Sequence, residues 1–190
     1  MQPGKARAPG RSRLLAAIVG LALLAAACGG GGSDDQSAES SPPAAAGPAE
    51  WQTLEVTDAN GDTFSIDDLV GRPVFVENFA TWCSNCRKQL GDTQDAAERA
   101  GDEAVFVALS VETELDGQDM KDYAADNGFS DIRFAVMSPE MLAAMSDAYG
   151  NSALNAPSTP KVKVEADGAA GKLVTGYEST GEILGGLGLG

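Results

Sequence analysis

One stretch decides the fold of this chain: Phe75-Val76-Glu77-Asn78-Phe79-Ala80-Thr81-Trp82-Cys83-Ser84-Asn85-Cys86-Arg87-Lys88-Gln89. It begins as an apolar strand, passes through Trp-Cys-x-x-Cys and continues with residues that favour a helix. A strand that leads into a helix places Cys83 at the helix N-terminus, where unpaired backbone N–H groups and the helix dipole stabilise a thiolate. Cys86 lies one helical turn further on and can attack a mixed disulfide formed at Cys83. The pair is therefore predicted to cycle between dithiol and disulfide.

Two other readings of the cysteine pair are disfavoured. A structural zinc site needs four ligands, usually Cys or His, and the chain has three cysteines and no histidine. A permanent structural disulfide across so short a loop would contribute little through loop-closure entropy. Redox chemistry at Cys83 and Cys86 is the leading prediction, with no metal and no cofactor.

The N-terminus has the pattern of an export signal over residues 1–27. Four basic residues and no acid come first, and an uninterrupted apolar run follows at 14–27. That run is too short to span a bilayer comfortably and ends in small residues. The sequence Leu23-Leu24-Ala25-Ala26-Ala27-Cys28 resembles a bacterial lipoprotein processing box, although the box usually has Leu where Ala25 stands. The resemblance predicts lipidation of Cys28; the alternative is an ordinary cleaved signal with a free Cys28.

Composition divides the rest of the chain into a tether and one domain. Residues 28–50 hold Cys28 and a flexible run of Gly, Ser, Pro and Ala, and residues 51–190 are the size of one domain with a proper core. The formal net charge is −15; loss of the four signal cations leaves nine basic and 28 acidic residues, or −19. So acidic a surface argues against nucleic acid and against charge-driven adhesion to anionic lipid. Such acidity suits a domain that needs a lipid to stay at the membrane, and a salty habitat is an equal explanation. From the export signal and the lipoprotein-like box we expect an extracytoplasmic domain, lipid-anchored to the outer face of the cell membrane.

The hydrophobic pattern alternates strands and helices, followed by a hairpin and a last helix. This order indicates an α/β fold whose sheet is covered on both faces. At Ser138-Pro139 the chain has a preferred helix start, with Ser as the N-cap and Pro at the first helical position. Strands are predicted at 51–56, 63–66, 74–80, 104–111, 132–137, 161–165 and 173–176, and helices from the Cys-x-x-Cys to Ala100, at 117–127, at 139–149 and, weakly, from Ser179.

The chain resembles the thioredoxin superfamily, and most of all its extracytoplasmic TlpA/ResA-like thiol-disulfide oxidoreductases. Residues 61–74, G-D-T-F-S-I-D-D-L-V-G-R-P-V, are similar to the lead-in of that family. Residues 79–88, F-A-T-W-C-S-N-C-R-K, are similar to its active-site motif, and residues 158–168, S-T-P-K-V-K-V-E-A-D-G, to its proline loop. The resemblance implies a thioredoxin-like fold, with a central mixed sheet and helices on both faces.

The resemblance also assigns roles to individual residues. The family's active-site proline has a cis peptide bond that brings the backbone of the preceding residue beside the redox pair to receive substrate, and Thr159-Pro160 is the matching position. Glu77 matches a buried acid that helps proton transfer at the second cysteine. Burial would raise the pKa of Glu77, but a Glu that reaches an edge or water is an equal alternative. Trp82 is expected to cover one side of the disulfide and also to pack.

Two positions depart from the family pattern. Gln89 stands where ResA-like members often carry an acid, so a proton relay would have to use Glu77. Lys161 follows the proline, where Thr is common. A cation there could lower the pKa of Cys83, but a solvated strand lysine is the favoured interpretation.

The resemblance implies a membrane-tethered reductase of exported protein disulfides, re-reduced by a membrane electron donor of the CcdA or DsbD type. A DsbA-like thiol oxidase is the alternative enzyme, and a non-catalytic or metal-delivering lipoprotein of the same fold is the alternative outside enzymes. Copper delivery of the Sco type would need Cys-x-x-x-Cys and a histidine, which this chain lacks. A peroxiredoxin is disfavoured because neither cysteine is preceded by its Pro and Thr/Ser pattern.

Overall fold

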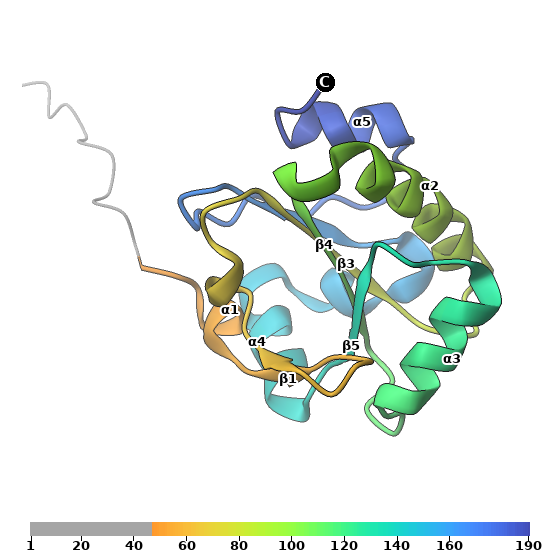
Figure 1. The fold of residues 1–190 in the computed structure, drawn as a ribbon. Helices are drawn as coiled ribbons and strands as arrows, with labels where there is room; N and C mark the ends of the chain where they lie inside the picture. The colour runs from red at the N-terminus through yellow and green to blue at the C-terminus, as the bar shows by residue number, and fades with distance from the viewer. Residues whose placement is uncertain (1–46) are drawn as a thin grey trace, which may run out of the picture. The chain divides into compact units, whose positions relative to one another are not determined.

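A computed structural model describes residues 47–190 of the chain (Figure 1). The predicted signal peptide at 1–27, Cys28 and most of the tether lie outside the described residues. Within 47–190, none of the helices has the length and apolar character that crossing a membrane requires.

The centre of the fold is a four-stranded mixed sheet in the order β5-β4-β3-β6. β3, β4 and β5 run parallel, whereas β6 is antiparallel to β3. All six residues of β3 are buried, as expected for a central strand that is covered on both faces. The strands are β3 (Val74–Phe79), β4 (Val105–Ser110), β5 (Arg133–Val136) and β6 (Lys161–Val164).

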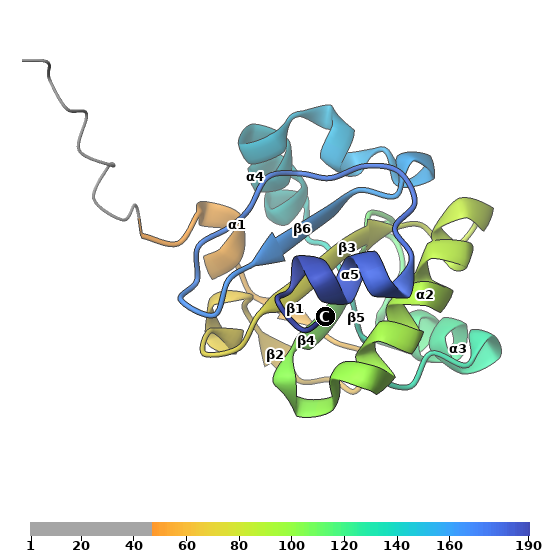
Figure 2. The same ribbon diagram turned by 90° about the horizontal axis from the view of Figure 1, so that it is seen from above.

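Helices cover both faces of this sheet, as predicted (Figures 1 and 2). The face that carries Phe75 and Phe79 packs against α2, α3 and α5. The opposite face, with Val74 and Val76, packs against α1 and α4. The alternation of side chains along β3 separates these two cores, because successive residues of a strand point to opposite faces. The helices are α1 (Glu50–Thr53), α2 (Ser84–Ala100), α3 (Gly117–Asn127), α4 (Pro139–Tyr149) and α5 (Thr180–Gly186).

Several helix ends lie where the sequence predicted them. The Ser138 hydroxyl accepts a hydrogen bond from the Met141 amide at 3.1 Å, and Pro139 is the first residue of α4. Gly128 ends α3 in the left-handed conformation, which glycine adopts without steric cost. These boundaries depend on neighbouring residues only, so sequence rules locate them.

The predicted strand at 51–56 is wrong in its first half, where the chain forms the short helix α1. Trp51 is fully buried, with its ring 6.0 Å from that of Tyr149 on α4. The Gln52 side chain accepts a hydrogen bond from the Ala49 amide and donates one to the carbonyl of Gly168. Tertiary contacts of this turn therefore override the alternating pattern. Only β1 (Val56–Thr57) is extended, paired with β2 (Thr63–Phe64) in the predicted hairpin.

The predicted strand at 173–176 is also absent as a regular element. Val174 forms an isolated bridge with Lys161, with both backbone hydrogen bonds at 2.8 Å. The segment follows β6 without a continuous ladder and then leads to α5, the predicted last helix. Figure 2 shows α5 beside α2 over the sheet. Gly186 of α5 lies against the end of the Lys163 side chain of β6.

Candidate active site

Cys83 and Cys86 are joined by a disulfide at the N-terminus of α2. Cys83 is the N-cap residue of this helix, and its sulfur accepts a hydrogen bond from the Cys86 amide at 3.1 Å. Cys86 lies one turn further in, and its sulfur is 3.1 Å from the carbonyl oxygen of Ala156. The two sulfurs therefore have different surroundings. Backbone N–H groups and the helix dipole favour a thiolate at Cys83, whereas a carbonyl acceptor favours a protonated thiol at Cys86.

Trp82, immediately before the pair, is 64% exposed. A large aromatic side chain this exposed is uncommon, and it lies next to the candidate nucleophile. Exposed aromatic residues of this kind are typical of surfaces that bind other proteins. Its predicted role in covering the disulfide stays a prediction.

The loop that holds Thr159 and Pro160 lies against the N-terminal turn of α2. The Asn85 side chain, between the two cysteines, donates a hydrogen bond to the carbonyl of Pro157 at 3.1 Å. The Pro160 carbonyl accepts from the Asn78 amide of β3 at 2.9 Å. The redox helix and this loop are thereby brought together, as the resemblance implied. The cis peptide bond before Pro160 stays a prediction.

Thr159 has an unusual backbone conformation, with φ at +47° and ψ at 62°. It is the one non-glycine residue with a positive φ among residues 47–190. For a β-branched side chain this left-handed conformation costs about 1–2 kcal/mol. Such strain persists only where surrounding contacts impose it, and it is common at functional sites.

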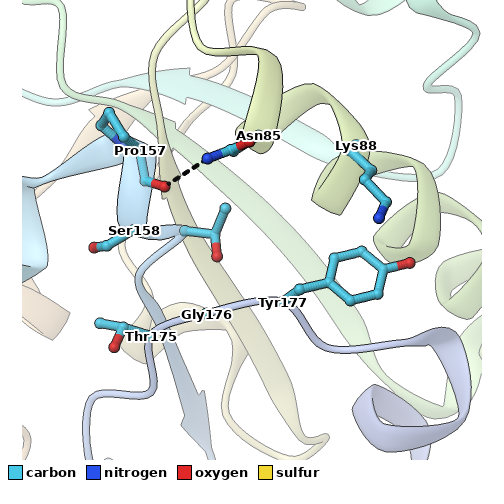
Figure 3. Close-up of a pocket in the computed structure, with 8 residues that line it drawn as sticks. Asn85, Lys88, Pro157, Ser158, Thr175, Gly176 and Tyr177 are labelled. Carbon is cyan, nitrogen blue, oxygen red and sulfur yellow. Dashed lines mark hydrogen bonds between the residues drawn. The ribbon is translucent and has the colours of Figure 1, made fainter.

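A groove of about 470 Å³ opens between α2, the Thr159 loop and the segment that follows β6 (Figure 3). Figure 3 shows Lys88 of α2 directed toward the ring of Tyr177, and its ammonium nitrogen is 4.2 Å from the ring centroid. Lys88 is the one charged side chain among the lining residues, although the chain as a whole is strongly acidic. The groove is lined by Asn85, Lys88, Pro157, Ser158, Thr159, Thr175, Gly176 and Tyr177.

Glu77 is fully buried in β3 beneath α2. Thr93 of α2 donates a hydrogen bond to one carboxylate oxygen at 2.8 Å, and the other oxygen has no partner among the described residues. Burial raises the pKa of Glu77 to about 8, although the Thr93 hydrogen bond and the Lys161 charge oppose the rise. Of the two predicted environments, the buried one is therefore observed. Within residues 47–190 no direct hydrogen bond joins Glu77 to a cysteine, and its role as a proton relay stays a prediction.

The favoured interpretation of Lys161 as a solvated lysine is wrong. Its side chain is 1% exposed, and its ammonium group donates hydrogen bonds to the carbonyls of Thr159, at 2.7 Å, and Gly176. It also lies directly opposite Glu77 in the register of β3 and β6. The alternating pattern Lys-Val-Lys-Val is typical of an edge strand with one solvent-exposed face. Here the segment after β6 and the helices above the sheet cover that face.

Gln89 has a function in the fold that sequence reasoning missed. Its buried amide donates to the carbonyl of Glu178 at 2.9 Å and accepts from the Glu178 amide at 2.8 Å. One turn on, the Asp92 carboxylate accepts from the amide and hydroxyl of Thr180, both at 3.2 Å. These contacts fasten the groove-forming segment to α2. The partners are 89 and 88 residues apart, and no local signal reveals them.

Among residues 47–190, no group of three or more Cys, Asp or Glu side chains is placed to hold a metal ion. The cysteine pair, the strained loop and the buried acid are thus the chemically distinctive features of the described chain.

Comparison with known proteins assigns the chain to a family. A model of the AhpC/TSA family matches residues 49–160, from α1 through Pro160. No curated protein matches the chain. Among solved structures, the exposed lipoprotein thioredoxin Etrx1 of Streptococcus pneumoniae is 23% identical, with a TM-score of 0.58 over 71% of this chain and 97% of that one.

Two further structures are similar. A thiol:disulfide interchange protein of the thioredoxin family from Chlorobium tepidum is 22% identical, with a TM-score of 0.60 over 74% of this chain and 94% of that one. StoA from Bacillus subtilis is 16% identical, with a TM-score of 0.55 over 72% and 96%. At these identities the likeness establishes the thioredoxin-like fold, and the family match covers more than half of the sequence. The chain therefore belongs to the AhpC/TSA family.

Proposed function

We propose that this chain is a thiol-disulfide oxidoreductase that reduces disulfides of exported proteins. The observation that carries the proposal is the Cys83–Cys86 pair at the N-terminus of α2, with the strained backbone of Thr159 in the adjoining loop. A reactive cysteine needs a stabilised thiolate, and the N-cap position of Cys83 supplies one. A resolving cysteine needs to keep its proton until the mixed disulfide has formed, and the Ala156 carbonyl beside Cys86 favours that state.

The reaction is two successive thiol-disulfide exchanges. The Cys83 thiolate attacks one sulfur of a client disulfide; a mixed disulfide forms, and the other client sulfur leaves as a thiolate and takes up a proton. The Cys86 thiol then loses its proton, and its sulfur attacks Cys83. The Cys83–Cys86 disulfide forms, and the first client sulfur leaves and takes up a proton. Overall, the enzyme passes two electrons to the client; one of the two protons comes from Cys86 and the other from solvent, because Cys83 reacts as a thiolate.

Glu77 is the proposed acceptor of the Cys86 proton. Its raised pKa of about 8 keeps it able to exchange protons near neutral pH. Gln89 stands where ResA-like proteins often carry an acid. Glu77 is therefore the acid that would take up the proton in the second exchange. Because Glu77 makes no direct hydrogen bond to Cys86 within the described residues, the transfer would pass through an intervening donor.

Client binding is assigned to the surface around the pair. The groove next to Asn85 and Thr159 adjoins the redox helix, and Trp82 offers an exposed apolar contact beside Cys83. The carbonyl of Thr159, before Pro160, would accept a hydrogen bond from the backbone of the client. Trp82, Thr159 and Pro160 are therefore the proposed substrate-binding residues.

The cellular setting of the proposal rests on the N-terminal sequence. The export signal at 1–27 and the lipoprotein-like box at Cys28 support a domain anchored by lipid to the outer face of the cell membrane. The similar Etrx1 is described as an exposed lipoprotein. Renewed activity requires a dithiol donor, and a membrane protein of the CcdA or DsbD type would fill that role. Metabolic labelling with a fatty acid, compared with a Cys28→Ser variant, tests the anchor.

The reduction potential of the Cys83–Cys86 pair tests the direction of electron flow. The full-length chain is equilibrated in thiol buffers of defined potential, and free thiols are counted by mass tagging. A value near −270 mV, as in thioredoxin, supports a reductase. A value near −120 mV supports a DsbA-like oxidase. Failure to cycle between dithiol and disulfide would overturn the redox function and leave a binding lipoprotein.

A further inference from the structure

Lys161 is a buried charge that the exchange reaction does not use. Its ammonium group donates to the Thr159 carbonyl at 2.7 Å and to the Gly176 carbonyl, and the Thr159 hydroxyl lies at 3.4 Å. Lysine has three N–H donors and rarely loses contact with water completely. Here nearly all of its hydrogen-bonding capacity is directed at the backbone of two residues.

Both acceptors belong to the walls of the groove. Thr159 comes from the loop beside the disulfide, and Gly176 from the segment after β6. The same two walls are joined by the Gly176 amide, which donates to the Ser158 carbonyl at 2.7 Å. The ammonium group of Lys161 therefore bridges the groove from beneath.

The Thr159 backbone requires such support. A β-branched residue with φ at +47° is strained, and the strain is relieved unless contacts oppose it. The Thr159 amide donates to the Ala156 carbonyl at 2.8 Å, which holds one side of the residue. The Lys161 ammonium holds the other side by binding the Thr159 carbonyl.

Neighbouring charges allow a cation to remain in this position. Glu77 of β3 lies opposite Lys161 in the sheet, and Glu178, in the segment before α5, also acts on it. Burial lowers the pKa of Lys161 and the charge of Lys163 adds to that effect, whereas Glu77 and Glu178 oppose it. A buried ammonium is tolerated when an acid and hydrogen-bond acceptors replace its water.

We propose that Lys161 is a positioning residue of the active site, which holds Thr159 in its left-handed conformation and thereby orients the Thr159 carbonyl, whose second lone pair would accept a hydrogen bond from the client. This inference rests on the proposed function, because the client is a protein disulfide. Lys161 itself touches neither the client nor the sulfur atoms. Its loss therefore affects client binding and leaves the chemistry at Cys83 intact.

The kinetic test separates binding from chemistry. The full-length chain reduces insulin, with dithiothreitol as electron donor, and reacts separately with dipyridyl disulfide, which is too small to need the groove. For Lys161→Met we expect KM for insulin to rise about tenfold, the factor set by the strained backbone of a non-glycine residue, with the rate of the first exchange with dipyridyl disulfide unchanged. Lys161→Arg, which keeps the donors, restores at least part of the loss. An unchanged KM in Lys161→Met overturns the proposal.

Lys163→Met is the matched control. Lys163 lies two residues along the same strand, and its ammonium binds the Glu178 carboxylate at 2.8 Å rather than Thr159. Removal of this second cation should leave KM for insulin unchanged. An equal rise in both variants would attribute the effect to general charge or stability and would overturn the role of Lys161.

A double-mutant cycle tests the conformation directly. Glycine adopts positive φ without steric cost, so Thr159→Gly removes the strain that Lys161 opposes. In the Thr159→Gly background, Lys161→Met should raise KM less than twofold, because interacting positions are non-additive. A full tenfold effect in that background would contradict the proposed mechanism.

Amide hydrogen exchange tests the contacts of Lys161 with Thr159 and Gly176 independently of enzyme activity. In the oxidised full-length chain, the Thr159 and Gly176 amides are hydrogen-bonded, and Lys161→Met should speed their exchange about tenfold or more, with Lys163→Met near wild type. If wild type does not reduce insulin, the proposed function fails, and exchange still tests the contact. Unchanged exchange would overturn the contact itself. Lys161→Gln serves as the second variant if Lys161→Met does not fold.

Discussion

Glu77 and Lys161 face each other across the antiparallel pair β3–β6, and both side chains are buried. Each group alters the ionisation of the other. Lys161 opposes the rise in the pKa of Glu77, and Glu77 opposes the fall in the pKa of Lys161. Lys161 also binds the Thr159 carbonyl. The ionisation of this buried pair is therefore linked to the conformation of the loop that lines the groove.

The raised pKa of Glu77 predicts how stability depends on pH. Between the ordinary value of 4.5 and the folded value of about 8, the folded state keeps a proton that the unfolded state has released. This contribution to stability is therefore full below 4.5 and falls as pH rises toward 8, by at most about 1.4 kcal/mol for each pH unit. Urea unfolding of wild type and Glu77→Gln across this range measures it. The variant should show the smaller slope, and equal slopes would contradict the assignment.

Glu77→Gln should also slow the second exchange of the reaction. The amide oxygen can still accept from Thr93, but the side chain no longer takes up a proton. We expect release of the mixed disulfide to slow about tenfold or more between about pH 6 and 8. Rapid-quench trapping of the mixed disulfide measures the rate. The Thr93→Val variant, which keeps the acid, is the control, and wild-type turnover of Glu77→Gln would remove Glu77 from the mechanism.

Removal of the resolving thiol should trap the client. In Cys86→Ser, Cys83 can still attack a client disulfide, but no second thiol releases the product. The mixed disulfide should accumulate and be visible on a non-reducing gel and by mass spectrometry. Cys83→Ser should form none. Equal trapping by the two variants would contradict the assignment of Cys83 as nucleophile.

The position of Lys88 in the groove predicts a preference for clients with acidic residues near the reacting cysteine. It is the one charged side chain that lines the groove in a chain of net charge −15. Lys88→Glu should slow reaction with a disulfide peptide that carries acids near its cysteine, by about three- to tenfold at low salt, and should leave a neutral peptide unaffected. Lys121→Glu on α3 makes the same charge change away from the groove. If both variants slow the reaction with the acidic peptide equally, the rate depends on the net charge of the protein and not on the groove.

Gln89→Ala should destabilise the domain. The substitution leaves the half-buried Glu178 amide and carbonyl without their Gln89 partners, and unpaired groups of this kind cost at most about 2–3 kcal/mol together. The midpoint of urea unfolding should fall accordingly. Gln118→Ala, which removes an exposed glutamine that binds Asp122, should change it little. A stability loss below about 0.5 kcal/mol would indicate that water replaces Gln89.

The sequence by itself determined the local framework. A continuous apolar run followed by Cys-x-x-Cys predicted β3 and the N-terminus of α2, and Ser138-Pro139 predicted the start of α4. These features depend on neighbouring residues, whose capping and steric preferences operate in any fold. The three-part resemblance added the central mixed sheet and the place of the proline loop.

Only the tertiary structure decided what surrounds the redox pair. Gln89 meets Glu178 after 89 residues, and the fully buried Trp51 fixes a helix where alternation predicted a strand. The alternating strand pattern predicted a solvated Lys161, yet the segment after β6 covers it. Whether a charged side chain is paired or exposed to solvent depends on which segments pack over it, and those segments are distant in sequence. The strained backbone of Thr159 and its support by Lys161 follow from that long-range packing.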